Sequence, residues 1–596
     1  MQTIRFIIKS FSLLREHQPG KLLLIFFLTL LQGVTSGFSI VLLIPLLQLI
    51  NIGGAEPEGI ALAILDFAGR AGIDLTMGSI LLVYISLLTF SALIQYWKAL
   101  LDARYQQTFI YTLRRRLFRK IIMADWQLLN SRSKTNHLQV LTREVPNLAN
   151  YYYYYLRLLT TVLMAGAYIV YAMLISPWFT LGITGVGLIL FMVLRRFLLR
   201  SFRLGKGYVD SYYRLLKYID DFWQTVKIAK VHSSEEYYSG RFDEANVSLL
   251  NMEYMMQRNW SLPQLIQRIT GLLVLTGVVW FGYTWGSVPL ASFVILILLF
   301  SRIFPQMTAI NTDLNMIATN VPSVRLVMQL DEDLPEPSAR GSKGIAALKL
   351  REGIDLEGIS FAYPDGEKLF EGFSAHIRAR AITGVVGHSG RGKTTLIDLI
   401  AGLQMPAAGR ILVDGVLLDD GLMPRWKAGL GYLPQDPFFI DGTLRENLVW
   451  DSGSRAAAGG VHGTGREQER GGAGVIHGTG REQERGGATI TDDEIMAVLG
   501  QVNAGHLVSR FRKGLDAFVV NWHTSFSGGE CQRLALARVL LRKPSVLLLD
   551  EATSSLDTEN EATVMEVLAQ LKERVTIVFV THRESVSRWF DEVIKI

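Results

Sequence analysis

The sequence predicts a multi-domain protein, with an all-α domain of six transmembrane helices first and an α/β domain of the P-loop type, with a helical subdomain, after it. Its 596 residues are more than one hydrophobic core organises. Hydrophobic residues make up 49% of the chain and charged residues only 19%, which is little charge for a water-soluble protein. The apolar excess lies before residue 315, and a phosphate-binding pattern follows at 387–395. We therefore expect one half in lipid and the other in water.

The first 21 residues (1–21) predict an amphipathic helix on the membrane surface. Apolar residues alternate with Arg5, Lys9 and Arg15 until Pro19 and Gly20 end the pattern. This pattern differs from that of a cleavable signal peptide. It fits a helix that lies in the membrane interface before the first span.

The predicted membrane domain covers residues 22–330. A bilayer core about 30 Å thick needs about 20 residues of helix, and helices are the expected form because lipid offers backbone groups no partners. Several stretches exceed that length, so we expect them to continue into the cytoplasm. The six predicted spans are 22–50, 77–101, 153–176, 178–203, 262–285 and 287–315.

Charges between the spans predict the orientation. The loop at 51–76 is acidic, with Arg70 as its one basic residue, and the next connection carries the basic run 114–120. Basic loops stay on the cytoplasmic side. Both termini and the α/β domain are therefore expected in the cytoplasm, and the protein in a bacterial cytoplasmic membrane. The single cysteine, Cys531, excludes an intrachain disulfide and fits a reducing compartment.

The net charge of +6 does not predict a nucleic-acid partner. Lys and Arg cluster beside the apolar helices, where the inner membrane face explains them. The lipid bilayer is the partner that this charge distribution favours.

Two long cytoplasmic connections, 102–152 and 204–261, predict helical extensions with breaks near 125–132 and 218–226. A linker rich in proline, serine and charge follows at 331–347.

The α/β domain is expected at 348–596, with an insertion at about 452–489. Within the insertion the twelve residues HGTGREQERGGA occur twice, and they contain no core residues. Such a segment predicts a surface loop without a packed core, and a neutral loop is favoured over a binding role.

Residues Gly387 to Thr395 match the phosphate-binding pattern G-x-x-x-x-G-K-[ST] between an apolar strand and a helix. Glycines let backbone N–H groups surround phosphates at the start of a helix. Lys393 is expected to pair with the β- and γ-phosphates, and the Thr394 hydroxyl to hold Mg²⁺. The candidate phosphate-binding residues are Gly387, Ser389, Gly390, Gly392, Lys393, Thr394 and Thr395.

Two further motifs lie downstream. The apolar strand 545–550 ends in Asp550, a candidate metal ligand, and Glu551 is placed to polarise an attacking water. Ser527, Gly528 and Gly529 are expected to begin another helix, and the N-terminus of a helix favours anions. Since the chain already has one phosphate loop, this second turn is expected to cap the nucleotide of a partner subunit. The sequence thus predicts a dimer.

These motifs together resemble those of the ATP-binding-cassette exporter family, over nearly the whole chain and in the family's order. The matching segments are Phe361–Pro364 (aromatic loop), 387–395 (Walker A), Leu433–Asp436 (Q-loop), Ser527–Glu530 (signature), Asp550-Glu551 (Walker B), Ser554–Asp557 (D-loop) and Thr581-His582 (switch).

The resemblance implies a half-transporter that works as a homodimer, with a heterodimer left open, and uses ATP and Mg²⁺. It implies that Glu551 is the general base, that His582 contacts the γ-phosphate, and that Gln435 links Mg²⁺ to the membrane half. Tyr363 would stack on adenine, and Asp557 would belong to the loop that faces the partner. The helix breaks would be coupling helices that dock on the ATPase domains.

The implied function is ATP-driven export or flipping of a lipid, lipid-linked glycan, peptide or amphipathic small molecule by alternating access. An ATP-gated channel or sensor subunit is the alternative, although Glu551 favours sustained turnover. Arg268 and Arg302 lie at similar depth in spans five and six. They predict either an anion site in a cavity or side chains that reach the inner interface. The five tyrosines at 151–155 predict an aromatic belt at that interface more than a ligand site.

The chain also departs from the family pattern. Phe526 and Glu530 replace the commoner Leu and Gln of the signature, and the usual Gly-Glu-Arg-Gly upstream is replaced by the residues at 520–523, Val-Asn-Trp-His. This second change puts the usual contact with the partner's coupling helix in doubt.

Overall fold

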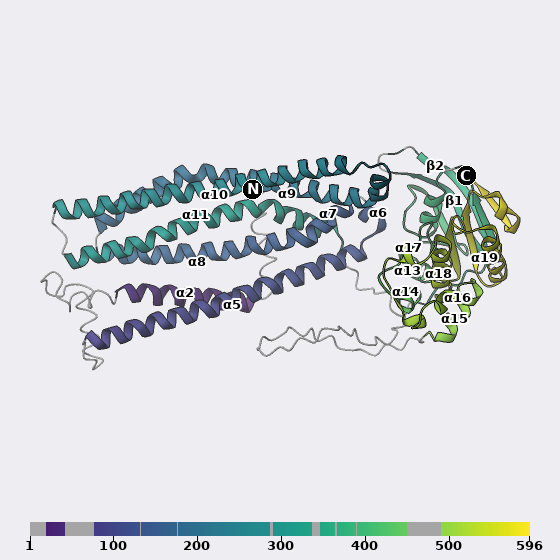
Figure 1. Ribbon diagram of the computed structural model, residues 1–596, viewed down its shortest axis with the longest axis horizontal. Coiled ribbons are helices and arrows are strands. Elements are labelled where there is room, and N and C mark those ends of the chain that lie inside the picture. Colours follow the sequence, from purple (N-terminus) through teal and green to yellow (C-terminus); the bar gives the residue numbers. More distant parts are fainter. Residues whose placement is uncertain are drawn as a thin grey trace. The chain divides into compact units, whose positions relative to one another are not determined.

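The chain divides into two compact units, Met1–Pro337 and Ser338–Ile596, which we describe separately (Figure 1). The expected surface helix at 1–21, except for its last three residues, and the expected insertion at 452–489 lie outside the described residues. The computed structural model describes residues 19–41, 77–130, 133–175, 177–285, 290–336, 346–363, 366, 368–388, 390–449 and 490–596.

The first unit is built from long helices that run side by side (Figure 1). Each of the six expected spans overlaps one of them, and four extend well beyond the span length. The long helices are α2 (Pro19–Val41), α5 (Met77–Met123), α8 (Val145–Ile175), α9 (Pro177–Val231), α10 (Glu235–Trp285) and α11 (Leu290–Asp333).

Within the described residues, three helical stretches are long and apolar enough to cross a membrane by length and composition. A shorter apolar helix lies at Pro19–Gln32. The three long stretches are Leu81–Met123, Lys134–Met173 and Thr180–Val231.

Close backbone approach and buried hydrogen bonds join α9, α10 and α11. A Cβ on Gly205 of α9 would lie 2.2 Å from the carbonyl oxygen of Thr319 on α11, so only glycine fits there. Asn259 Nδ2 donates to Ser201 Oγ at 2.8 Å, and Ser201 Oγ donates to Asn315 Oδ1 at 2.8 Å. In lipid, small residues and interhelical hydrogen bonds hold helices together, because an apolar side chain gains little by leaving lipid for a protein interior.

The first expected helix break lies where the sequence places it, but the second does not. After α5, the short helices α6 (Trp126–Asn130) and α7 (Lys134–Gln139) precede a π-helical turn, Val140–Glu144. The break expected near 218–226 is wrong, because α9 continues to Val231 and the chain turns at 232–234. No glycine or proline interrupts 218–226, whereas Ser233 has a left-handed φ of 49° that ends the helix.

The second unit contains a five-stranded parallel sheet in the order β11-β3-β10-β9-β6. Strand β9 is buried throughout, and its residues alternate between two hydrophobic cores, one on each face of the sheet. This explains its continuous apolar sequence. The strands are β3 (Ile382–Val386), β6 (Leu430–Leu433), β9 (Val546–Asp550), β10 (Thr576–Thr581) and β11 (Glu592–Lys595).

An antiparallel sheet, β2-β1-β4-β5, and helix α12 (Lys393–Ile400) contribute to one of these cores, and a group of helices around α18 contributes to the other. The antiparallel strands are β1 (Gly353–Ala362), β2 (Lys368–Arg378), β4 (Ala408–Val413) and β5 (Val416–Leu417). The helical part includes β7 (Gly442–Thr443), α14 (Leu444–Leu448), α15 (Asp492–Gln501), α16 (Gly505–Ser509), β8 (Phe518–Val519), α17 (Trp522–Ser525) and α18 (Gly528–Leu541), and α19 (Thr558–Leu571) follows β9.

Candidate functional site

Four neighbouring strands of the parallel sheet deliver the predicted site residues to one edge. In spatial order, β3 leads into the phosphate loop, β10 into His582, β9 into Asp550 and Glu551, and β6 into Gln435. The carboxyl ends of parallel strands meet at the same edge of a sheet, which is where ligands bind in such folds. Residues far apart in sequence are thereby brought into one row.

The glycines of the phosphate loop are required by backbone shape and by space. Gly390 and Gly392 have φ values of 83° and 97°, a region that side chains disfavour. A Cβ on Gly392 would lie 2.5 Å from Leu369 Cδ2, and one on Gly387 would lie 2.6 Å from the carbonyl oxygen of Ile596. Backbone conformation therefore favours glycine at positions 390 and 392, and the neighbouring atoms leave little room for a side chain at positions 387 and 392.

Lys393 is the first residue of α12 and is buried at 7% exposure. Its ammonium donates to the carbonyl oxygens of Gly387 at 3.0 Å and His388 at 3.1 Å, so it bends back over the loop. A phosphate placed on this loop would exchange these neutral acceptors for charged ones, which are stronger. Ser389 lies outside the described residues.

Two of the three candidate metal ligands, Thr394 and Asp550, meet at the start of α12. The Thr394 hydroxyl forms a hydrogen bond with the buried Asp550 carboxylate. Burial raises the pKa of Asp550, the nearby Glu551 charge adds to the rise, and Lys393 opposes it. A hydroxyl, a carboxylate and the exposed amide of Gln435 form a set of hard oxygen donors that fits Mg²⁺, which prefers such ligands together with phosphate oxygens and water.

Glu551 and His582 form a pair at the ends of β9 and β10. Glu551 Oε1 lies 3.2 Å from His582 Nδ1. The backbone of Glu551 has a left-handed φ of 50°, which costs a non-glycine residue about 1 kcal/mol. Its N–H donates to the carbonyl oxygen of Val580 at 3.1 Å. This strained turn directs the carboxylate away from the strand and toward the histidine.

Tyr363 is a half-exposed ring beside the phosphate loop. Its hydroxyl lies 3.2 Å from Thr395 Oγ1, and its ring meets Phe361 edge to face at 5.1 Å. The ring is thus held in place by two contacts and still exposes 43% of its surface, which leaves area for stacking on adenine.

The second anion-favouring turn is a fully formed helix cap. Ser527 Oγ accepts from the N–H of Glu530 at 3.3 Å, and the Glu530 carboxylate accepts from the N–H of Ser527 at 2.8 Å. Glu530 also pairs with Arg510, with 2.5 Å between Nη2 and Oε1. Gly528 and Gly529 lie against Ser555, so the turn and the 554–557 loop are neighbours.

Arg583, which the sequence did not single out, fastens the 554–557 loop. Its guanidinium donates to the carbonyl oxygen of Ser554 at 2.6 Å and to Glu561 Oε1 at 3.0 Å. Asp557, within this loop, caps α19 by accepting from the N–H of Asn560 at 2.9 Å. In the sequence, only its position next to His582 could have pointed to Arg583.

Asp398 is a second residue that sequence reasoning missed. It lies one turn after Thr394 on α12, and burial, together with the charge of Asp550, raises its pKa to about 6. The signal was a carboxylate in an otherwise apolar helix end, Leu-Ile-Asp-Leu-Ile.

In the first unit, a cavity of about 650 Å³ lies among α8, α10 and α11. Arg157 and Arg268 line it, together with Gln267, which is 5% exposed and whose Oε1 has no hydrogen-bond partner among the described residues. Arg157 Nε donates at 2.7 Å to Asp313, which is fully buried. Arg302 lies on α11, but the structure does not describe the position of its side chain. The remaining lining is mostly apolar, including Leu272, Leu275, Phe300, Phe304 and Pro305.

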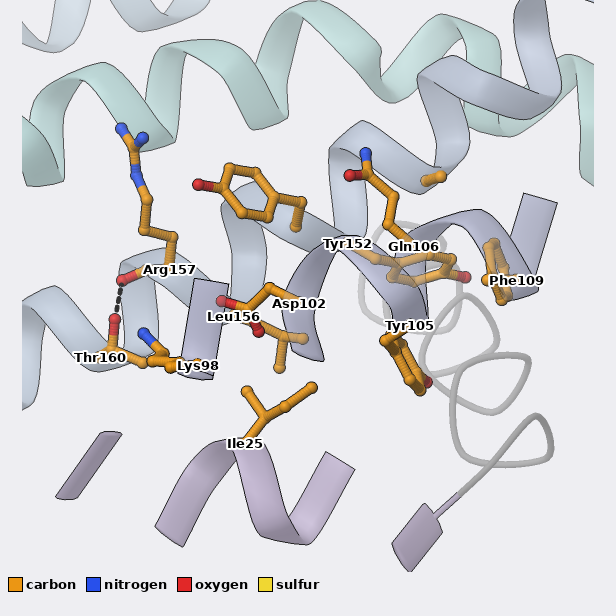
Figure 2. A pocket seen from close by; sticks show the side chains of 12 residues that line it. Ile25, Lys98, Asp102, Tyr105, Gln106, Phe109, Tyr152, Leu156, Arg157 and Thr160 are labelled. Carbon is orange, nitrogen blue, oxygen red and sulfur yellow. Dashed lines mark hydrogen bonds between the residues drawn. The ribbon is translucent and has the colours of Figure 1, made fainter. Parts of the chain in front are cut away.

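A second cavity, among α2, α5 and α8, also includes Arg157, with Lys98 and Asp102 on α5 (Figure 2). Its volume of about 90 Å³ is well below the roughly 300 Å³ at which small-molecule sites begin. It is therefore too small for a transported molecule. Tyr152, at 3% exposure, packs edge to face on Phe109 at 5.3 Å. The expected aromatic belt is thus wrong for Tyr151 and Tyr152, which face the helix core because α5 packs on that side of α8.

Comparison with known proteins identifies both units. Residues 22–307 match the ABC transporter transmembrane region, and residues 370–554 match the ABC transporter family model. An uncharacterized ABC transporter ATP-binding protein of Bacillus subtilis, YwjA, is 28% identical over 374 residues, 62% of this chain and 58% of that protein. A multidrug resistance ABC transporter ATP-binding and permease protein of Lactococcus lactis is 32% identical over 241 residues, 39% of this chain and 35% of that protein. The matches thus span less than two thirds of the length of either relative.

A solved structure has the same fold. It is that of a bacterial Atm1-family ABC exporter with ATP bound, at a TM-score of 0.76 and 19% identity, covering 97% of this chain and 93% of that one. The helical unit is thus a transmembrane domain, the α/β unit is an ATP-binding domain, and the protein is integral to a membrane. This chain belongs to the ABC transporter family, with the architecture of an exporter half-transporter.

Proposed function

We propose that two copies of this chain use ATP hydrolysis to export an amphipathic anion across the bacterial cytoplasmic membrane, with the ATP-binding domains and both termini in the cytoplasm. The observation that carries the ATPase part is the row of phosphate loop, His582, Asp550-Glu551 and Gln435 along one sheet edge. The observation that carries the substrate class is the arginine-lined cavity of the transmembrane domain.

In the nucleotide site, the loop from Gly387 to Thr395 binds the phosphates, and Tyr363 stacks on the adenine. Thr394, Asp550 and Gln435 hold Mg²⁺, which when bound neutralises charge on the β- and γ-phosphates. Glu551 accepts the proton of the attacking water, and His582 orients Glu551 and contacts the γ-phosphate. The 3.2 Å approach of the last two side chains supports this division of roles.

Each complete site combines two copies. Ser527, Gly528 and Gly529 present the N-terminus of a 14-residue helix, whose dipole favours anions. They lie against Ser555, in the loop that carries Asp557. In this arrangement one copy supplies the phosphate loop and the other supplies the capping turn, and ATP binding holds the two domains together.

In the transmembrane domain, the 650 Å³ cavity has the size of a small-molecule site. Arg268 supplies positive charge, and Arg157 adds to it when the substrate's anion takes the place of Asp313. The carbonyl of Gln267 accepts a hydrogen bond, and Leu272 and Phe304 supply apolar walls. An acidic lipid or an acylated peptide carries this combination of a negative head, an N–H or O–H donor and an apolar part.

Transport into inverted membrane vesicles tests the proposal. N-lauroylglycine, which has a carboxylate, an amide N–H and an acyl chain, should accumulate above its external concentration with ATP, and its neutral carboxamide should not. The Glu551→Gln variant is the matched control, because it keeps the cavity and removes turnover. Equilibration of the probe without accumulation would instead favour an ATP-gated channel.

A further inference from the structure

The segment just before the Ser527 turn departs from the family pattern, and the proposed ATP chemistry does not use it. Here Trp522, which is 3% exposed, lies in the middle of a stack of three aromatic rings. Its ring is 4.4 Å from that of Phe439 with 10° between the planes, and 5.3 Å from that of Phe526 with 26° between them. The indole Nε1–H also donates to the carbonyl oxygen of Ile440 at 2.9 Å.

The two ends of this stack lie next to two different parts of the proposed nucleotide sites. Phe439 follows Gln435, the candidate ligand at the chain's own site, by four residues. Phe526 directly precedes Ser527, the cap of the turn that is proposed to face the partner's nucleotide. The stack is therefore a packed path between the own site and the partner-facing site.

A second set of contacts makes this path rigid. Arg538 of α18 donates to the carbonyl oxygens of Asn447 at 2.7 Å and Phe438 at 2.8 Å, and its guanidinium lies 4.3 Å from the centre of the Phe439 ring. The Asn447 side chain in turn accepts from the N–H of Ile440 at 3.0 Å and donates to its carbonyl at 2.9 Å.

The strands β7 and β8 pair directly beside the stack. The segments 438–447 and 518–526 are consequently held by ring stacking, side-chain hydrogen bonds and a short β-ladder at once. A displacement of one segment then carries the other with it, because packed elements respond as units.

We infer that Trp522 is a positioning residue that transmits the state of the Gln435 segment to the Ser527 turn, so that each copy's own nucleotide controls how it caps the partner's. This inference rests on the proposed function, in which sites are shared between two copies. The flat contact between stacked rings fixes the tilt of Phe526 and hence of the cap. An aliphatic side chain would fill space at this position without fixing that angle.

The test compares Trp522→Leu and Phe439→Leu, which break the stack from two positions, with Trp522→Phe, which keeps a ring there. The full-length chain in lipid nanodiscs is assayed for MgATP affinity (in the Glu551→Gln background), ATP turnover and vanadate-trapped ADP. We expect MgATP affinity to stay within about twofold in the leucine variants, while kcat and trapping fall about tenfold, as small misplacements of catalytic groups do. Trp522→Phe should keep at least half of the wild-type turnover.

Phe373→Leu is the matched control for loss of a ring contact. Phe373 lies 5.3 Å from Phe370 in the antiparallel sheet of the same domain, outside the path. It should lower the unfolding temperature without separating binding from turnover. Wild-type turnover and trapping in both leucine variants would overturn the inference, as would a parallel loss of affinity, turnover and unfolding temperature. Failure of wild-type protein to trap ADP would instead overturn the proposed shared site.

Discussion

Glu551 Oε1 lies 3.2 Å from His582 Nδ1, although the two residues follow different strands. The strained backbone at Glu551, with its φ of 50°, turns the carboxylate out of the sheet edge. Strain of this kind persists only where the surroundings enforce it, and at Glu551 it coincides with the approach to His582.

Glu551→Gln should therefore abolish turnover without abolishing nucleotide binding. The amide keeps the shape of the side chain but cannot accept a proton, so kcat should fall at least about 10²-fold. Phosphate release and MgATP binding, measured on the same preparation, check this. Wild-type hydrolysis rates in the variant would contradict the assignment of the base.

The phosphate loop should be far less tolerant of alanine at Gly392 than an ordinary turn glycine is. Both Gly392 and Gly415 have positive φ values, 97° and 73°, but only at Gly392 does an added Cβ meet other atoms, 2.5 Å from Leu369 Cδ2. Gly415→Ala should cost about 1 kcal/mol of stability, from backbone strain alone. Gly392→Ala should cost more and abolish MgATP binding. Equal effects of the two substitutions would argue against a spatial requirement in the loop.

Arg510 should set how easily the Ser527 turn accepts a phosphate. It neutralises Glu530, which otherwise places a negative charge at the helix start, and the two groups are 2.5 Å apart. Arg510→Ala should raise the ATP concentration for half-maximal turnover about threefold, the range expected for a partly exposed charge pair. Glu530→Gln in the same chain should reverse the effect. If the double variant behaves like Arg510→Ala, the pair acts through structure and not through charge.

Asp398 should make the chain less stable as pH rises. Its folded-state pKa of about 6 lies above the ordinary value of 3.8, so the folded state holds the proton more tightly than the unfolded state. This contribution to stability is fully present below about pH 4 and is lost as pH rises through 6. Asp398→Asn should raise stability at pH 7.5 by about 1 to 2 kcal/mol after allowance for solvent screening. It should change little at pH 4. Unfolding temperatures of both proteins at the two pH values measure this, and an equal shift at both would contradict it.

In the transmembrane cavity, an anionic substrate should compete with Asp313 for Arg157. Asp313→Asn frees the guanidinium, so N-lauroylglycine should stimulate ATP hydrolysis at about a tenfold lower concentration, the effect of about 1.4 kcal/mol. Its neutral carboxamide should be unaffected. Arg157→Gln alone leaves Asp313 buried without its cation and should destabilise the protein by about 3 kcal/mol.

Arg157→Gln is therefore combined with Asp313→Asn. That double variant should fold and lose the preference for the acid. Retention of the preference would assign the anion site to Arg268 or elsewhere.

The candidate nucleotide-site residues could be proposed from the sequence because each lies on a local pattern. A glycine-rich turn between an apolar strand and a helix is a pattern carried by a few neighbouring residues. The apolar strand that ends in Asp550-Glu551 gains its meaning from the presence of that turn upstream. The residues that escaped prediction act through partners distant in sequence. Arg583 is informative only once Ser554 and Glu561 are beside it, and Arg157 only once α8 packs on α11 and meets Asp313.

By itself, the sequence determined the two-domain architecture, the apolar helices and the order of the nucleotide motifs, because hydropathy and turn chemistry act over a few residues. The tertiary structure alone decided where α9 turns, which tyrosines face the core, and that Trp522 joins Phe439 to Phe526. These outcomes depend on contacts between segments that are distant in the chain, and no local pattern records which surfaces will meet when the helices and sheets pack.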